Sequence, residues 1–313
     1  GMVTLNIYKL HFTTPLHIGD SRDDYSISLK TIQSDTMYAA IISCLAKLGA
    51  KIPDNGDLGC TISSLFPFYQ KDENAAPVYF FPKPLKQILP KLENVDNAKK
   101  IKKVTWLDKA YFERVLKGEI LFEDAKSISD IRNVYLTNQP IDDTFIMSQV
   151  SPRVLISRNG QEDATPFYMD RVYFKDYSGL YFIVEGNTDL LEQGLNLLQY
   201  EGVGTDRNIG NGCFVCRRDY LPLELPETCN TAMSLSMFIP RNNEQLRSMI
   251  SDKDKSAYDF TRRGGWITTP PYNTYRKNTV HAFLPASVFS LQMDGLCVMG
   301  DIVNLTPEVE NVR

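Results

Sequence analysis

The feature that most constrains this fold is a loop in which four glycines fall within the eleven residues 202–212. Apolar residues at helical spacing precede the loop, and β-type residues from Cys213 onward follow it, so we predict a helix before the loop and a strand after it. A dinucleotide-binding glycine loop has the reverse order. We therefore exclude a dinucleotide site and predict that the bare backbone amides, together with Arg207 and Asn208, bind phosphate groups. The alternative is a plain structural turn, which explains two glycines more easily than four.

Composition limits where an anionic partner can bind. The 313 residues carry 34 Lys+Arg against 38 Asp+Glu, a formal net charge of −4, so a nucleic-acid site must be a local patch. The six cysteines are few and scattered and no signal segment opens the chain, which indicates free thiols and a cytoplasmic setting. Cys213 and Cys216 have no second cysteine pair or nearby histidine, so no metal site is expected. No apolar run is long enough to span a membrane.

The N-terminal residues 3–12 alternate in polarity, which predicts a strand with one buried face. Helical spacing then begins at Ser34, whose hydroxyl suits an N-cap, and Asp35 beside it complements the helix dipole. His17 and Gly19 lie in the loop directly after the strand. The exposed amides of the helix start make it a candidate phosphate site. For His17 an ordinary loop histidine is the alternative.

A long hairpin is predicted between residues 150 and 174. Two extended runs flank Asn159-Gly160, the dipeptide that most readily supplies the positive φ angles of a tight hairpin turn. Arg153 and Arg158 lie among serines, a mixture suited to phosphate and 2′-hydroxyl contacts with single-stranded RNA. An ordinary surface hairpin is the alternative.

Taken in order, the predicted elements are strand, helix, strand, inserted hairpin, strand, helix, glycine loop and strand. This is the order of a ferredoxin-like fold with a large insertion, and the fold class is therefore α+β. A new alternating pattern begins after Pro222, so we place a domain boundary near residue 221. The lysine cluster at 99–103 either faces RNA or is a solvated surface.

Five short stretches lie in a fixed order along the chain. They are Pro15-Leu16-His17-Ile18-Gly19, Ser34-Asp35-Thr36-Met37-Tyr38-Ala39-Ala40-Ile41, Tyr79-Phe80-Phe81-Pro82-Lys83-Pro84, the Gly202 to Gly212 loop with Cys213-Phe214, and Arg263-Gly264-Gly265-Trp266. Their order and spacing resemble the RAMP superfamily of CRISPR-associated proteins, and within it the family of the fourth Csm subunit of type III-A effector complexes. The resemblance covers nearly the whole chain.

The resemblance implies two ferredoxin-like, RRM-related domains. Residues 1–221 form the first domain, with a thumb hairpin at about 148–174 and the glycine-rich loop at 202–212, and residues 222–313 form a second domain that stops short of its relatives. It further implies a non-catalytic subunit, without a cofactor, that grips the 5′ repeat-derived handle of the CRISPR RNA in antiviral defence. The implied protein partners are the large signature subunit and the repeated backbone subunit, and no membrane is involved.

By residue, the resemblance places handle binding on the loop after the first strand, the helix start, the thumb and the glycine loop. With the residues chosen on chemical grounds, the predicted RNA-binding set is His17, Gly19, Ser34, Asp35, Ser151, Pro152, Arg153, Arg158, Gly202, Gly204, Arg207, Asn208, Gly210 and Gly212. The rival function is a metal-independent RAMP endoribonuclease that processes CRISPR RNA with His17 as general acid or base. A third is an interaction module whose glycine loop contacts protein alone.

Overall fold

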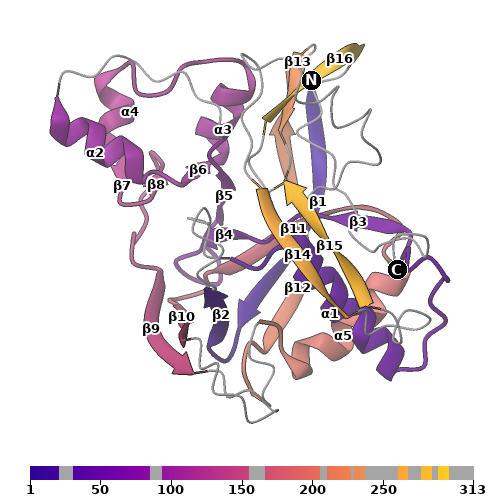
Figure 1. Ribbon diagram of the computed structural model, residues 1–313. Coiled ribbons are helices and arrows are strands. Elements are labelled where there is room, and N and C mark those ends of the chain that lie inside the picture. The colour runs from indigo at the N-terminus through magenta and orange to yellow at the C-terminus, as the bar shows by residue number, and fades with distance from the viewer. Residues whose placement is uncertain are drawn as a thin grey trace.

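The computed structural model of the chain describes residues 1–20, 31–84, 94–154, 166–204, 210–226, 229–233, 235–236, 260–266, 276–283 and 288–295. Over these ranges the protein is a mixed α+β structure with large sheets and few helices (Figure 1). No helix in them has the length and apolar character needed to cross a membrane.

The largest sheet has nine strands in the order β12-β1-β11-β4-β5-β6-β8-β7, with β3 paired to β11. The strands are β1 (Met2–Phe12), β3 (Cys60–Ile62), β4 (Phe66–Tyr69), β5 (Val78–Pro82), β6 (Trp106–Asp108), β7 (Ile131–Arg132), β8 (Tyr135–Leu136), β11 (Gly179–Gly186) and β12 (Phe214–Glu224). The strand predicted at residues 3–12 is confirmed as β1. The expectation of a single buried face is wrong, because Ile7 belongs to one hydrophobic core and Leu10 to the other, so that helices or strands cover both faces of the middle of β1.

Helices α1 (Ser34–Lys47) and α5 (Asp189–Glu201) share the second of these cores with Leu10. They pack closely, since a Cβ on Gly194 of α5 would lie 2.7 Å from Cγ2 of Ile41 in α1. The two helices therefore cover one face of the large sheet as a pair.

Helix α1 begins differently from the prediction. Its N-cap is Gln33 rather than Ser34, because Ser34 is already the first helical residue and its amide donates to Oγ of Ser64 at 3.0 Å. The N-cap of α5 is Thr188. Neither N-cap side chain makes a capping hydrogen bond. The amides at these helix starts are bound by other groups, which propensity at the cap position does not reveal.

An insertion between β5 and β11 forms α2 (Val95–Lys103), α3 (Lys109–Leu116) and α4 (Ala125–Ser129) beside β6, β7 and β8. It stands at one side of the large sheet in Figure 1. The rings of Phe81 in β5 and Phe112 in α3 are fully buried and stack with centroids 4.3 Å apart and planes 3° apart. This aromatic pair joins the insertion to the sheet.

The segment Phe66-Pro67-Phe68-Tyr69, which the sequence analysis did not place in a strand, forms β4 in the interior of the large sheet. All four residues are buried. Proline lacks an amide for the ladder and is rare in such a position. Here the burial of Phe66 and Phe68 on the first core outweighs that loss.

A separate sheet has the order β2-β10-β9. Its strands are β2 (Leu16–Asp20), β9 (Ile146–Val154) and β10 (Pro166–Phe174). The segment holding His17 and Gly19 is thus a strand rather than the loop expected, because β10 supplies a pairing partner. Strands β9 and β10 pair antiparallel, and the predicted turn at Asn159-Gly160 lies outside the described residues.

Two further sheets come from the last third of the chain. They pair β13 (Cys229–Met233) with β16 (Val288–Gly295), and β14 (Phe260–Trp266) with β15 (Arg276–Phe283). The first of these segments begins after β12, which runs three residues past residue 221. Leu235 then belongs to the first core, and its carbonyl accepts the amide of Ser64 at 2.9 Å.

Strand β12 is an edge of the large sheet, and side chains close much of that edge. Three amides spaced four residues apart donate to side-chain oxygens, and midway between the last two, Pro222 has no amide. The three bonds join Cys216 to Oε1 of Gln199 (2.9 Å), Tyr220 to Oδ1 of Asp219 (2.8 Å) and Glu224 to Oε2 of Glu113 (2.7 Å). Few amides of this edge are therefore open to another strand.

Candidate nucleic-acid interface

The two ends of the glycine loop meet each other and lie on the segment that joins β1 to β2. The amide of Val203 donates to the carbonyl of Gly212 at 3.0 Å, and the amide of Gly212 donates to the carbonyl of Pro15 at 2.8 Å. Beside them, the amide of Cys213 donates to Oγ1 of Thr14 at 2.9 Å. The base of the loop is thus fixed against the start of β2.

Close packing explains why this loop needs glycine. Gly202 and Gly212 have φ angles of +86° and +64°, and a Cβ on either would lie 1.9 Å from a backbone carbonyl oxygen at the other end of the loop. A Cβ on Gly204, whose φ is +127°, would lie 2.6 Å from the carbonyl oxygen of His17. Gly210 also has a positive φ, +97°, but no atom lies within 4 Å of its Cβ position. Three glycines are therefore fixed by contact as well as by backbone angle.

The β2-β10-β9 sheet connects the glycine loop with the predicted thumb. Gly19 in β2 pairs with Met169 in β10, and Met169 pairs with Ser151 in β9. Pro152 and Arg153 follow Ser151 along β9. Two groups of predicted residues that lie far apart in the sequence thus share one small sheet.

Arg171, which the sequence analysis did not single out, lies in the same sheet. It pairs with His17 in β2 and with Gln149 in β9. Its guanidinium carbon is 5.5 Å from the centroid of the Tyr173 ring, and Arg171 is exposed whereas His17 is only 6% exposed. An exposed cation over an aromatic ring suits phosphate contact and base stacking. The alternation of β10 was a usable signal, because residues 171 and 173 share a face.

The start of α1 offers less to a phosphate than predicted. Ser34 is 2% exposed and its amide donates to Ser64, while the amide of Thr36 donates to Oδ1 of Asp35 at 2.9 Å. A phosphate would have to displace these bonds and approach the Asp35 carboxylate. The three remaining predicted residues, Arg158, Arg207 and Asn208, lie outside the described residues.

A polar cluster lies on the sheet face opposite α1 and α5. Nζ of Lys9 is 3.5 Å from Oδ2 of Asp219, and the Tyr79 hydroxyl donates to the same oxygen at 3.2 Å. Nearby, burial together with the positive charges of Lys9 and Arg217 lowers the pKa of His11 to about 4. His11 is therefore neutral near pH 7.

This pKa makes stability depend on pH. An unfolded histidine has a pKa near 6.5, so below that pH the unfolded chain binds a proton that the folded chain accepts only near pH 4. The folded state should therefore lose stability as pH falls from about 6.5 to about 4. As pH falls through this window, the unfolding free energy of the protein should drop by about 2 kcal/mol relative to that of its His11→Gln variant.

Urea unfolding at several pH values measures this difference. Above about pH 7 both histidine states are neutral, so the difference should be constant there and serves as the internal control. A difference that does not change at any pH would contradict the buried, neutral state of His11.

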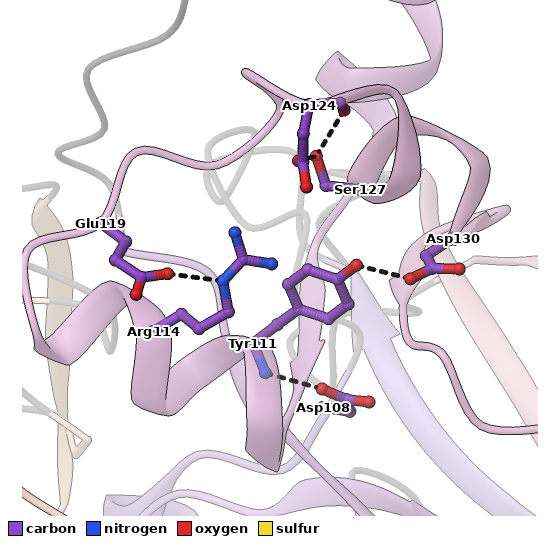
Figure 2. A network of polar contacts seen from close by, with 7 residues as sticks. All are labelled: Asp108, Tyr111, Arg114, Glu119, Asp124, Ser127 and Asp130. Atoms are coloured by element: carbon purple, nitrogen blue, oxygen red, sulfur yellow. Dashed lines mark hydrogen bonds and ion pairs between the residues drawn. The ribbon is translucent and has the colours of Figure 1, made fainter.

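The polar side chains of the insertion bind one another (Figure 2). The Tyr111 hydroxyl donates to Oδ2 of Asp130 at 2.5 Å, and the Tyr111 amide donates to Oδ1 of Asp108 at 2.9 Å. Burial raises the pKa of both Tyr111 and Asp108. On the outer side, Nε of Arg114 lies 2.6 Å from Oε2 of Glu119. Because these groups bind each other, the network stabilises the insertion and offers no exposed acid–base pair.

The described part of the chain contains no group of three His, Cys, Asp or Glu side chains arranged to hold a metal ion. Cys44, Cys60, Cys213 and Cys216 are free thiols. Burial raises the pKa of Cys216 to about 12, which keeps it protonated near pH 7.

Comparison with known proteins gives a consistent result. Residues 227–311 match the family model of the CRISPR Csm4 C-terminal domain. The chain is 25% identical over 305 residues to the "CRISPR system Cms protein Csm4" of Streptococcus thermophilus. The matched region covers 93% of this chain and 91% of that protein.

Two solved structures share the fold. One is the Csm3-Csm4 subcomplex in the type III-A CRISPR-Cas interference complex, with a TM-score of 0.54, 17% identity and coverage of 95% of this chain and 94% of that chain. The other is the Csm1-Csm4 cassette in complex with cA4, with a TM-score of 0.54, 16% identity and coverage of 94% and 89%.

These matches support a RAMP-like CRISPR protein with a mixed α+β fold, as the order of the motifs predicted. Within that class the chain is Csm4-like, which confirms the more particular resemblance.

Proposed function

We propose that this chain is a non-catalytic RNA-binding subunit of a type III-A CRISPR effector complex that grips the 5′ repeat-derived handle of the CRISPR RNA. The observation that carries the proposal is the docking of the glycine loop on the segment entering β2. Through β10 that strand is joined to β9, which holds Ser151, Pro152 and Arg153. A strand of RNA lying along this sheet would contact the loop amides, Arg171 and the thumb together.

We further propose two ferredoxin-like domains, residues 1–221 and 222–313, with β9 and β10 as the root of a thumb hairpin. The order β-α-β-β-α-β supports the first domain. It is formed along the chain, with other elements inserted, by β1, α1, β4, β11, α5 and β12. The match of residues 227–311 to a family model of a C-terminal domain supports a boundary near residue 221.

The names of the relatives suggest the protein partners. Solved Csm4 structures are described as assemblies with Csm1 and with Csm3. By analogy, this chain would link the large signature subunit to the repeated backbone subunit, in the cytoplasm and without a cofactor of its own.

Replacing one arginine of the thumb and one of the glycine loop tests handle binding. In the complex assembled with its partner subunits, Arg153→Ala with Arg207→Ala should weaken binding of a labelled handle RNA about 10- to 100-fold, because each arginine loses charged hydrogen bonds to phosphate. The control variant, Arg132→Ala with Lys71→Ala, removes two exposed cations from other elements and should bind as the parent does. Equal affinity of the double-arginine variant and the parent would refute these assignments.

A cleavage assay separates this function from its rival. Repeat RNA incubated with the protein in EDTA should remain intact on a gel. Cleavage that the His17→Ala variant abolishes would instead establish a metal-independent nuclease. The 6% exposure of His17 is in keeping with a structural role for this residue.

A further inference from the structure

Helix α2 presents lysines on one side and is anchored on the other. Asn94 caps the helix, its side chain accepting the amides of Asp96 at 2.9 Å and Asn97 at 3.4 Å. Of the helical residues only Ile101 is buried, at 1% exposure, and it belongs to the first core. At about 100° per residue, Lys99, Lys100 and Lys103 fall within an arc of about 100° on the opposite side. We call these three residues the lysine face.

The lysine face has a single acidic neighbour on its own helix, Asp96, which lies on the same side one turn before Lys99 and Lys100 and forms no ion pair with them. All three lysines are exposed, and none forms an ion pair with the described residues. Among the other cations of the insertion, Arg114 pairs with Glu119 and Lys117 with Glu224, whereas Lys109, Lys126 and Arg132 form no ion pair with the described residues. The buried insertion carboxylates are also engaged, as Figure 2 shows for those bound by Tyr111.

Helix stability alone does not call for so much positive charge. The C-terminal end of a helix carries about half a negative charge, which one nearby lysine balances. Helix α2 has four lysines, with Lys102 at the edge of the lysine face, against the single acidic residue Asp96. The excess charge on an exposed and thinly anchored helix therefore favours contact with an anionic partner.

We propose that the lysine face binds the phosphodiester backbone of single-stranded RNA outside the handle, an inference that rests on the proposed function. Lysine ammonium groups contact phosphates as point charges and read no base. The described part of α2 has no aromatic residue on which a base could stack. The contact is therefore electrostatic and independent of sequence, unlike the handle grip at the glycine loop.

The salt dependence of binding tests this inference. The triple variant Lys99→Gln, Lys100→Gln and Lys103→Gln is compared with a control triple, Lys51→Gln, Lys71→Gln and Lys126→Gln, which removes three exposed charges elsewhere. Glutamine keeps the helix propensity of lysine, so α2 should persist. Affinity for a handle RNA with a single-stranded extension, and for a scrambled RNA of equal length, is measured between about 50 and 200 mM salt. Both the full chain and its assembled complex are used.

Each lost phosphate contact lowers the slope of log affinity against log salt by about 0.7 for single-stranded RNA. The magnitude of the slope should therefore be about 2 smaller for the lysine-face variant than for the parent, equally for both RNAs. The control triple should leave the slope almost unchanged. Unchanged slopes would overturn the inference. Loss of assembly with partner subunits at unchanged slope would also overturn it, by assigning the lysine face to an acidic protein surface.

The ratio of handle to scrambled affinity reports separately on the proposed function. A parent protein without handle preference would refute the handle grip, whatever the slopes show. A preserved preference in the lysine-face variant, together with the loss of slope, supports both. The two failures are therefore distinguishable.

Discussion

Replacing Gly212 by alanine is expected to lower the free energy of unfolding by about 3–5 kcal/mol and to abolish handle binding. The residue has a φ of +64°, where an L-residue costs about 1–2 kcal/mol. The new Cβ would also lie 1.9 Å from the carbonyl oxygen of Val203, so the base of the loop must open. Opening breaks the bonds from Val203 to Gly212 and from Gly212 to Pro15.

Gly210 provides the matched control for this variant. Its φ is also positive, at +97°, but no atom lies within 4 Å of its Cβ position, so Gly210→Ala should cost only the backbone strain of about 1–2 kcal/mol and leave the base of the loop closed. Thermal midpoints and handle affinities of the two variants are measured side by side. Equal losses in both would mean that backbone angle, and not the contact with Val203, makes the glycine necessary.

Truncating Phe112 to alanine is expected to cost about 3–5 kcal/mol, a large part of the stability of a typical folded chain. The side chain is fully buried and its ring stacks on Phe81 at 4.3 Å, so the change leaves a cavity between α3 and the sheet. Because this pair joins the insertion to the sheet, α2 and its lysine face should lose their fixed position.

Unfolding by urea, followed by tryptophan fluorescence, measures the effect. The chain has 2 tryptophans, of which Trp106 is buried in the same core as Phe112. Phe112→Leu, which leaves a smaller cavity, should cost about 1.5 kcal/mol, and Tyr200→Ala, at an 81% exposed aromatic, less than about 0.5. A Phe112→Ala variant as stable as the Tyr200→Ala variant would show that the stacked pair does not hold the insertion.

Local periodicity predicted the elements whose burial follows one repeating pattern. Helices α1 and α5 are confirmed because each presents its apolar residues at the helical period, and strand β1 is confirmed in its position, although its middle residues are buried on both faces. Strand β4 was missed because Pro67 interrupts its pattern, and its stability comes from tertiary burial of the flanking phenylalanines. The cap of α1 was misplaced because Ser64, distant in sequence, binds the amide of Ser34.

The candidate site was only partly predictable for the same reason. The glycine loop was evident from composition, since a cluster of glycines is a local property. Its docking on Pro15 was not, because that contact joins residues almost two hundred positions apart. The pairing of Arg171 with Tyr173 on one face of β10 was visible in the sequence, but the register of β2 and β10, which places Arg171 opposite His17, was not.

The closed edge of β12 affects how this chain can bind other chains. A strand that offers few free amides is a poor template for pairing with another strand, so a second chain should not add to the large sheet at β12. Partners that approach this side must be recognised by the shape and charge of side chains, which differ from protein to protein, and not by the backbone that all chains share. The edge therefore favours partners with a complementary surface over any chain that could add a strand.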